Sequence, residues 1–231
     1  MRKAALLCFA IALAGVAGPA SARMPVVVEL YTAQGCSSCV GSGQVIADLS
    51  GEPHVLALTF GVDYWDYLGW RDTFAQPEFT ERQRAYMTHF AQRDVYTPQL
   101  VVDGRLQAPA LPADKAETLV RDAERAPHDP PQVVFRGAAR VAVGSGPAPK
   151  GGADVWLIRY DPKEQSVAVK SGENHGQTVV EHNVVRQLVR LGAWSGRSKS
   201  FRLPAPSADG LDTVVIVQGV HGGRIVAVKK S

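Results

Sequence analysis

Two cysteines, Cys36 and Cys39, stand two residues apart directly after the apolar, β-branched run "PVVVELY". That run predicts a strand over residues 26–32, and residues 37–49 predict a helix after it. A Cys-x-x-Cys at a strand-to-helix junction places the first thiol at the helix N-terminus, where unpaired amide groups favour a thiolate. Cys36 is therefore the predicted nucleophile, and Cys39, one turn later, is the predicted resolving thiol.

Three kinds of chemistry use such a pair: redox exchange, metal binding and a structural disulfide. A structural zinc site usually needs four ligands, and the sequence has neither a second Cys-x-x-Cys nor a tight pairing among its six histidines. A chain of 231 residues can bury a core without cysteine cross-links, which makes a stabilising bridge unnecessary. Redox exchange is the favoured interpretation, and a copper or zinc carrier or a structural bridge remains open.

The first residues have the pattern of a secretory signal peptide. Arg2 and Lys3 precede a short apolar run, which ends at the small residues Ala20-Ser21-Ala22. The run is too short to span a bilayer comfortably, so we expect cleavage after residue 22, which also removes Cys8. The mature protein is then predicted to be periplasmic or secreted, with no membrane span, and to keep Cys36 and Cys39 in a compartment where disulfides persist.

Composition divides the rest of the chain in two. Before a proline-rich linker at residues 127–132, strand and helix patterns alternate, with a helical insertion around residues 78–91. After it, short strand-like runs are separated by turn residues. The prediction is an α/β domain over residues 23–126, followed by an all-β, sandwich-like domain over residues 133–231. The net charge is only +3 and the basic residues are scattered, which gives no support for nucleic acid binding.

The stretch "VYTPQLVVDG" adds a second motif. Pro98 cannot donate to a strand ladder, so it is expected at the start of the strand, after a cis or trans peptide bond. This order of motifs resembles the thioredoxin superfamily, in which a cis-proline loop faces the Cys-x-x-Cys and pairs with an extended substrate. The resemblance implies that Thr97 and Pro98 position the substrate, and that Glu29 on the first strand lies beneath the disulfide and relays protons for Cys39. A structural Glu29, exposed or hydrogen-bonded, is the alternative.

Longer strings resemble one particular family. "VVELYTAQGCSSC", "FGVDYWDYLGWRDTFAQPEFTERQRAY" and "SGENHGQTVVEHNVVRQLVRLGAWSG" are similar to the bacterial secreted family called domain of unknown function 1223. The resemblance implies a thioredoxin-like fold with a β-rich extension. This chain has Val40-Gly41 where that family commonly has two prolines, and Gly61 where it commonly has a histidine. The first change is expected to loosen the active-site junction, and the second removes a titrating neighbour.

The sequence therefore predicts a thiol-disulfide oxidoreductase that acts on protein thiols or disulfides and is reset by an unidentified redox partner. No dissociable cofactor is expected, because the cysteines carry the electrons. Trp65, in an aromatic loop, is a candidate for substrate contact, although such clusters more often pack an inserted helix on its sheet. The alternative from another class is a binding protein that has kept a thioredoxin-like fold without its redox activity.

Overall fold

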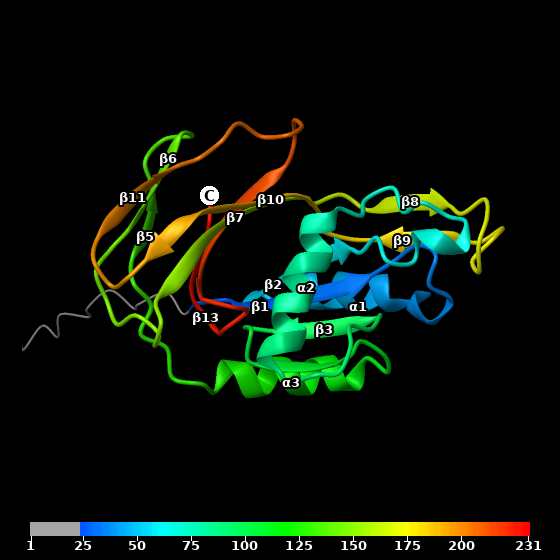
Figure 1. The fold of residues 1–231 in the computed structure, drawn as a ribbon, viewed down its shortest axis with the longest axis horizontal. Coiled ribbons are helices and arrows are strands. Elements are labelled where there is room, and N and C mark those ends of the chain that lie inside the picture. Colours follow the sequence, from blue (N-terminus) through cyan, green and yellow to red (C-terminus); the bar gives the residue numbers. More distant parts are fainter. Residues whose placement is uncertain (1–23) are drawn as a thin grey trace, which may run out of the picture.

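The computed structural model describes residues 24–231, and its centre is one eight-stranded mixed sheet (Figure 1). The strand order is β13-β12-β7-β10-β2-β1-β3-β4. The predicted signal peptide lies outside the described residues, and within them no helix is long and apolar enough to cross a membrane. The N-terminal half contains the strands β1 (Val26–Thr32), β2 (Val55–Gly61), β3 (Gln99–Val102) and β4 (Leu106–Pro109), and the helices α1 (Ser42–Ser50), α2 (Pro77–His89) and α3 (Asp114–Glu124).

Strand β1 is buried over its whole length, as its β-branched sequence predicts. It runs parallel to β2 and antiparallel to β3. Successive side chains of a strand point to opposite faces of the sheet. Val26, Val28 and Leu30 pack with apolar side chains of α1 and α3, whereas Val27 and Tyr31 pack in the cluster that includes α2. Helices therefore cover both faces of this half of the sheet.

The predicted helix over residues 37–49 is interrupted in the structure. A 3-10 turn, η1 (Ser37–Cys39), comes first, and α1 begins only at Ser42. Gly41 separates the two with a φ of 89°, a left-handed conformation that glycine adopts readily and other residues rarely do. The single predicted helix is wrong at this point, and Cys36 precedes a three-residue turn instead of the N-terminus of α1.

The strands after α3 continue the same sheet. β10 (Val184–Trp194) pairs in parallel with β2 through Val184 and Thr59, and β7, β12 and β13 extend the sheet beyond it. The mixed α/β character of the chain is confirmed, and its two halves share one sheet. The other strands of this extension are β7 (Ala153–Asp161), β12 (Asp212–Gly219) and β13 (Ile225–Lys230).

Two smaller sheets lie at opposite ends of the molecule (Figure 1). β5 (Val133–Phe135), β6 (Arg140–Val143) and β11 (Lys199–Arg202) share an apolar cluster with β7, β12 and β13, which gives this end sandwich-like packing. The hairpin of β8 (Gln165–Ala168) and β9 (Thr178–Glu181) lies beside α1. A Cβ on Gly43 of α1 would overlap the carbonyl oxygen of Val180, so glycine permits this close approach. The approach brings C-terminal residues next to the Cys-x-x-Cys turn.

Candidate functional site

Cys36 and Cys39 form a disulfide across the η1 turn, with their Cα atoms 5.3 Å apart. The N–H of Cys39 donates to the carbonyl oxygen of Cys36 at 3.1 Å, which closes the turn. The exposed fraction is 0% for Cys36 and 5% for Cys39. The disulfide is thus enclosed by other parts of the chain, and those parts define the candidate site.

The predicted substrate-positioning residues lie against Cys36. The Thr97–Pro98 peptide bond is cis, and the Thr97 hydroxyl donates to the Cys36 Sγ at 3.2 Å. Trp65 Nε1 donates to the oxygen of the same hydroxyl at 2.8 Å. Because an indole N–H can only donate, this bond orients Thr97 so that its own hydrogen points to the sulfur. The structure therefore brings together residues from three positions that are distant in sequence, Cys36, Trp65 and the Thr97–Pro98 pair.

A second hydroxyl lies beside the same sulfur. Ser38 Oγ is 3.3 Å from Cys36 Sγ and donates to the carbonyl oxygen of Thr97 at 3.4 Å. Hydrogen bonds to a charged sulfur are stronger than those to a neutral one. Because Ser38 gives its hydrogen to Thr97, the Thr97 hydroxyl is the side-chain donor directed at the Cys36 sulfur, where the sequence predicted the amide groups of a helix N-terminus.

Replacing Thr97 with valine is expected to make the reduction potential of the cysteine pair more negative by about 30 mV, because the Cys36 thiolate loses a donor worth about 1.5–3 kcal/mol while the disulfide loses a weaker one. The potential would be measured by equilibration with glutathione. Thr118→Val, on the exposed face of α3, is the matched control and should leave the potential unchanged. An unchanged potential in Thr97→Val would contradict this role.

Glu29 is buried and hydrogen-bonded to residues other than the cysteines. Its carboxylate accepts bonds from Arg82 Nε at 3.0 Å and Arg82 Nη2 at 2.7 Å, and from the hydroxyls of Tyr31 and Tyr86. Neither cysteine is among these partners. The pair is fully enclosed, with side-chain exposures of 4% for Arg82 and 1% for Glu29. Burial opposes the charge on Arg82, but the Glu29 carboxylate outweighs it and the pKa of the guanidinium is raised.

The buried acid that reaches the Cys-x-x-Cys turn is Glu181, at the end of β9. It lines a cavity of about 200 Å³ together with Cys39. Burial, and then the charge of Asp72, raise the pKa of Glu181 to about 8. Its hydrogen-bond partner is Gln34 Nε2, at 3.3 Å. Such a pKa allows Glu181 to give or take a proton near neutral pH.

The raised pKa of Glu181 also predicts how the stability of the folded protein depends on pH. The ordinary pKa is 4.5 and the folded value is about 8, so the folded protein holds a proton that the unfolded chain has already released. The free energy of unfolding should therefore fall as pH rises between these values, by up to about 1.4 kcal/mol per pH unit.

Glu181→Gln is expected to remove this fall, because the amide resembles the protonated acid. Urea denaturation from pH 5 to pH 9 would measure it, with Glu164→Gln, at a side chain that is 60% exposed, as the control. Parallel curves for Glu181→Gln and the wild type would show that Glu181 does not bind this proton.

A loop from the C-terminal half packs against the Cys-x-x-Cys turn, which the sequence did not indicate. We call residues 169–177, between β8 and β9, the cover loop. Its Asn174 is buried and donates through Nδ2 to the carbonyl oxygens of Gln34 at 2.8 Å and Cys36 at 3.0 Å. The Ser37 N–H donates to the Glu173 carboxylate at 3.2 Å. The signal that could have found this contact is the polar string "SGENHGQ", whose Asn and Gly residues are also typical of a turn.

The aromatic loop around residues 64–70 divides between the site and the surface. Trp65 binds Thr97, and Trp70 Nε1 donates to Gln34 Oε1 at 3.1 Å, whereas Tyr67 is 81% exposed. Just before this loop, Gly61 packs closely on the chain, since a Cβ there would lie 3.1 Å from the Ala75 nitrogen. A histidine at position 61 would therefore require this segment to move.

Metal ligands were an open alternative for the cysteine pair. Within residues 24–231, no three His, Cys, Asp or Glu side chains are grouped so that they could hold a metal ion. A tetrahedral site on the two thiolates would need two further ligands.

Comparisons with known proteins identify the family. The crystal structure of a protein from Agrobacterium tumefaciens is similar to this chain, with 29% sequence identity and a TM-score of 0.71, covering 91% of this chain and 95% of that one. A search of curated proteins gives no match. The family model described as "Protein of unknown function (DUF1223)" matches residues 27–218. Because this match spans most of the sequence, the chain belongs to the DUF1223 family.

Proposed function

We propose that this protein is a secreted or periplasmic thiol-disulfide oxidoreductase with a thioredoxin-like fold. The observation that carries the proposal is the Thr97 hydroxyl, which is held by Trp65 and donates to the Cys36 sulfur of a Cys-x-x-Cys disulfide. A structural bridge needs no donor aimed at one of its sulfurs, whereas a reacting thiolate is stabilised by one.

The arrangement of elements supports the thioredoxin-like assignment. The Cys-x-x-Cys turn follows β1, the Thr97–Pro98 loop precedes β3, and the β3–β4 hairpin leads to α3. Helices cover both faces of this part of the sheet. The secreted or periplasmic location is supported by the signal-peptide pattern of the first 22 residues.

The exchange reaction needs only the two cysteines. In the reduced protein, the Cys36 thiolate attacks one sulfur of a protein disulfide, forms a mixed disulfide and releases the other sulfur as a thiolate. The Cys39 thiolate then attacks Cys36, which releases the second substrate sulfur and closes the Cys36–Cys39 disulfide. Two electrons pass to the substrate, and the opposite direction uses the same steps in reverse. Glu181, which lines a cavity with Cys39, is the proposed acceptor, in its ionised form, of the proton that Cys39 gives up before its attack.

Access to Cys36 requires the cover loop to move, because the sulfur is buried in the closed arrangement. Asn174 holds the loop through its two donated bonds, but its Oδ1 is buried without a hydrogen-bond partner. A buried oxygen without a partner costs about 1–3 kcal/mol, which lowers the net stability of the closed loop. The loop is therefore the part of the site that is expected to open.

Asn174→Ala is expected to speed the reduction of the disulfide by dithiothreitol about tenfold, because two hydrogen bonds of about 1 kcal/mol each no longer oppose opening, while removal of the unpaired Oδ1 offsets part of this effect. His175→Ala, at the exposed neighbouring position, is the control and should match the wild type. Reduction followed by the mass of alkylated protein would measure both. Equal rates for Asn174→Ala and the wild type would mean that this contact does not limit access.

The burial of Cys36 also favours the second candidate function, a binding protein without exchange activity. Turnover separates the two candidates. The wild type is expected to accelerate the reduction of a disulfide-linked model peptide by dithiothreitol, whereas Cys36→Ser should leave only the uncatalysed rate. If the wild type gives no acceleration, the binding function is favoured over the enzyme.

A further inference from the structure

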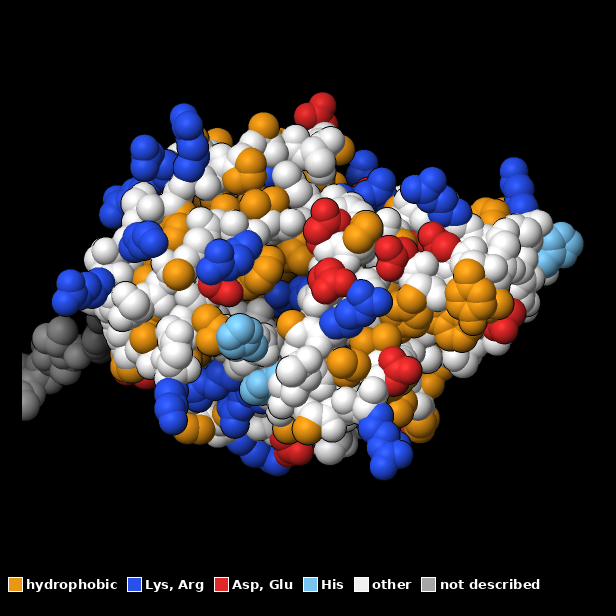
Figure 2. Space-filling view, viewed as in Figure 1, with side chains coloured by type: hydrophobic (Ala, Val, Ile, Leu, Met, Phe, Trp, Pro, Cys, Tyr) orange, Lys and Arg blue, Asp and Glu red, His pale blue; other side chains and the backbone are white. Residues whose placement is uncertain are grey.

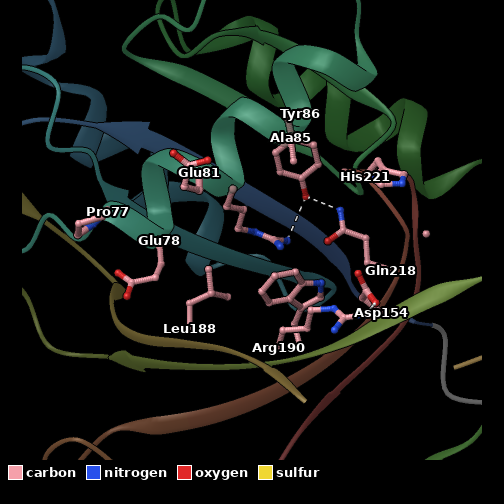
Figure 3. Close-up of a pocket in the computed structure, with 14 residues that line it drawn as sticks. Pro77, Glu78, Glu81, Ala85, Tyr86, Asp154, Leu188, Arg190, Gln218 and His221 are labelled. Carbon is pink, nitrogen blue, oxygen red and sulfur yellow. Dashed lines mark hydrogen bonds and ion pairs between the residues drawn. The ribbon is translucent and has the colours of Figure 1, made fainter. Parts of the chain in front are cut away.

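A second cavity, separate from the disulfide, lies between α2 and the face of the sheet formed by β7, β10 and β12. Its volume is about 550 Å³, which is within the range of sites for small organic ligands. Figure 2 shows a recess beside α2, with acidic side chains on one side and basic and histidine side chains on the other. Figure 3 shows its lining residues turned toward a common space.

Apolar groups form most of the wall. Pro77 and Ala85 come from α2, Trp156 from β7 and Leu188 from β10. Gly222, in the turn after β12, closes one end, since a Cβ there would lie 2.8 Å from the Ala85 backbone. The wall therefore favours a ligand with a flat or extended apolar body.

A hydrogen-bond donor faces the cavity at its floor. Arg82 uses Nε and Nη2 for Glu29, and Nη2 also donates to the Tyr86 hydroxyl at 3.1 Å. Its remaining nitrogen, Nη1, has no hydrogen-bond partner among the described residues, although Arg82 lines the cavity and is only 6% exposed. Nη1 therefore offers N–H groups to a bound molecule.

A hydrogen-bond acceptor lies on the same wall. Gln218 Nε2 donates to the Tyr86 hydroxyl at 2.9 Å and to the Gly223 carbonyl oxygen at 2.8 Å. Because a carbonyl oxygen can only accept, the second bond fixes which end of the amide is nitrogen. Gln218 Oε1 has no partner in the described part of the chain, and Gln218 is 2% exposed. Figure 3 shows the dashed bond that joins Gln218 to Tyr86, and Arg82 Nη2 donates to the same hydroxyl, so the side chains with the free donor and the free acceptor are neighbours.

The charges around the cavity disfavour an anion. The charge of Arg82 at the floor is already matched by Glu29, and the ion pair of Asp154 and Arg190 at the mouth is likewise neutral. Glu78 adds negative charge on the α2 side, where Glu81 is paired with Arg84. A carboxylate or phosphate would meet this negative field without a free opposite charge.

We infer that this cavity binds a neutral carboxamide with an apolar, ring-sized body. The amide oxygen accepts from Arg82 Nη1, the amide N–H donates to Gln218 Oε1, and the body packs on Trp156 and Leu188. An amide is the neutral group that supplies an acceptor and a donor side by side, which neither a hydrocarbon nor a carboxylate does.

Three probes of matched shape test this inference on the mature protein by isothermal titration calorimetry: naphthalene-2-carboxamide, naphthalene-2-carboxylate and 2-methylnaphthalene. The carboxamide is expected to bind saturably and about tenfold more tightly than either of the others, since they leave the floor groups unpaired. Absence of saturable carboxamide binding at millimolar concentration would overturn the site. Equal binding of the hydrocarbon, or tighter binding of the carboxylate, would overturn the amide class.

Leu188→Trp fills the cavity without removing a floor group, so carboxamide binding should weaken at least about tenfold while the thermal unfolding midpoint is retained. Unchanged binding in this variant would place the ligand elsewhere. Should the variant not fold, the three probes on the wild type still decide the outcome. Arg82 is left intact in this test because its loss would leave the Glu29 carboxylate buried without its cation.

Discussion

Replacing Cys39 with serine is expected to trap protein substrates on Cys36 as stable mixed disulfides. Cys36 still attacks, with Thr97 in place beside its sulfur, but the thiol that would resolve the intermediate is absent. Incubation of the reduced variant with a disulfide-containing protein, followed by non-reducing electrophoresis and intact mass measurement, should show roughly tenfold or more adduct than the wild type under the same conditions.

The matched control is Cys36→Ser, which should form no adduct because Cys36, the predicted nucleophile, is the sulfur that accepts the donor from Thr97. Adduct on Cys36→Ser in place of Cys39→Ser would reverse the two roles. Absence of adduct in both variants, with an authentic oxidised substrate present, would contradict exchange through this pair.

Replacing Arg82 with methionine is expected to lower the free energy of unfolding by about 3–5 kcal/mol, because the substitution leaves the Glu29 carboxylate buried without its cation. The remaining partners, Tyr31 and Tyr86, donate one hydrogen bond each and cannot balance a full charge. Urea denaturation monitored by circular dichroism would give the difference at constant pH.

Two further variants separate the charge from general damage to α2. Arg84→Met, on the same helix at a pair whose side chains are 52% and 67% exposed, should cost at most about 1 kcal/mol. Combining Arg82→Met with Glu29→Gln should recover part of the loss, because no charge then remains unpaired. Equal losses in Arg82→Met and Arg84→Met would mean that the buried ion pair does not stabilise the fold.

Local sequence patterns predicted the parts of the site that are adjacent in sequence to β1 and β3. The β-branched run before Cys36 predicted β1, and the missing N–H of Pro98 predicted its place before β3. Both motifs belong to strands that pair directly with each other, so their meeting follows from the order of elements. The helix after Cys36 was wrong in detail because Gly41 adopts a left-handed conformation that composition alone does not reveal.

The remaining site residues come from far along the chain. Asn174 and Glu181 reach the turn because β10 joins β2 at the middle of the sheet and carries the β8–β9 hairpin beside α1. The spacing of apolar residues within one segment does not predict the pairing of β10 with β2. That pairing depends on which edge of the sheet is not yet paired with another strand. The partner of Glu29 could not be predicted either. The alternation of side chains between the two faces of β1 does not show that Arg82 of α2 binds Glu29.

The reduction potential of the Cys36–Cys39 pair tests the central claim most directly. Equilibrating the folded mature protein with glutathione or dithiothreitol buffers would measure it. If the protein is the proposed enzyme, the pair should be reduced and oxidised reversibly. Its reduction potential should lie in the range from about −270 mV, typical of a reductant, to about −120 mV, typical of an oxidant. A pair that stays oxidised below about −300 mV, or is reduced only when the protein unfolds, would identify a structural bridge and contradict the proposed enzyme.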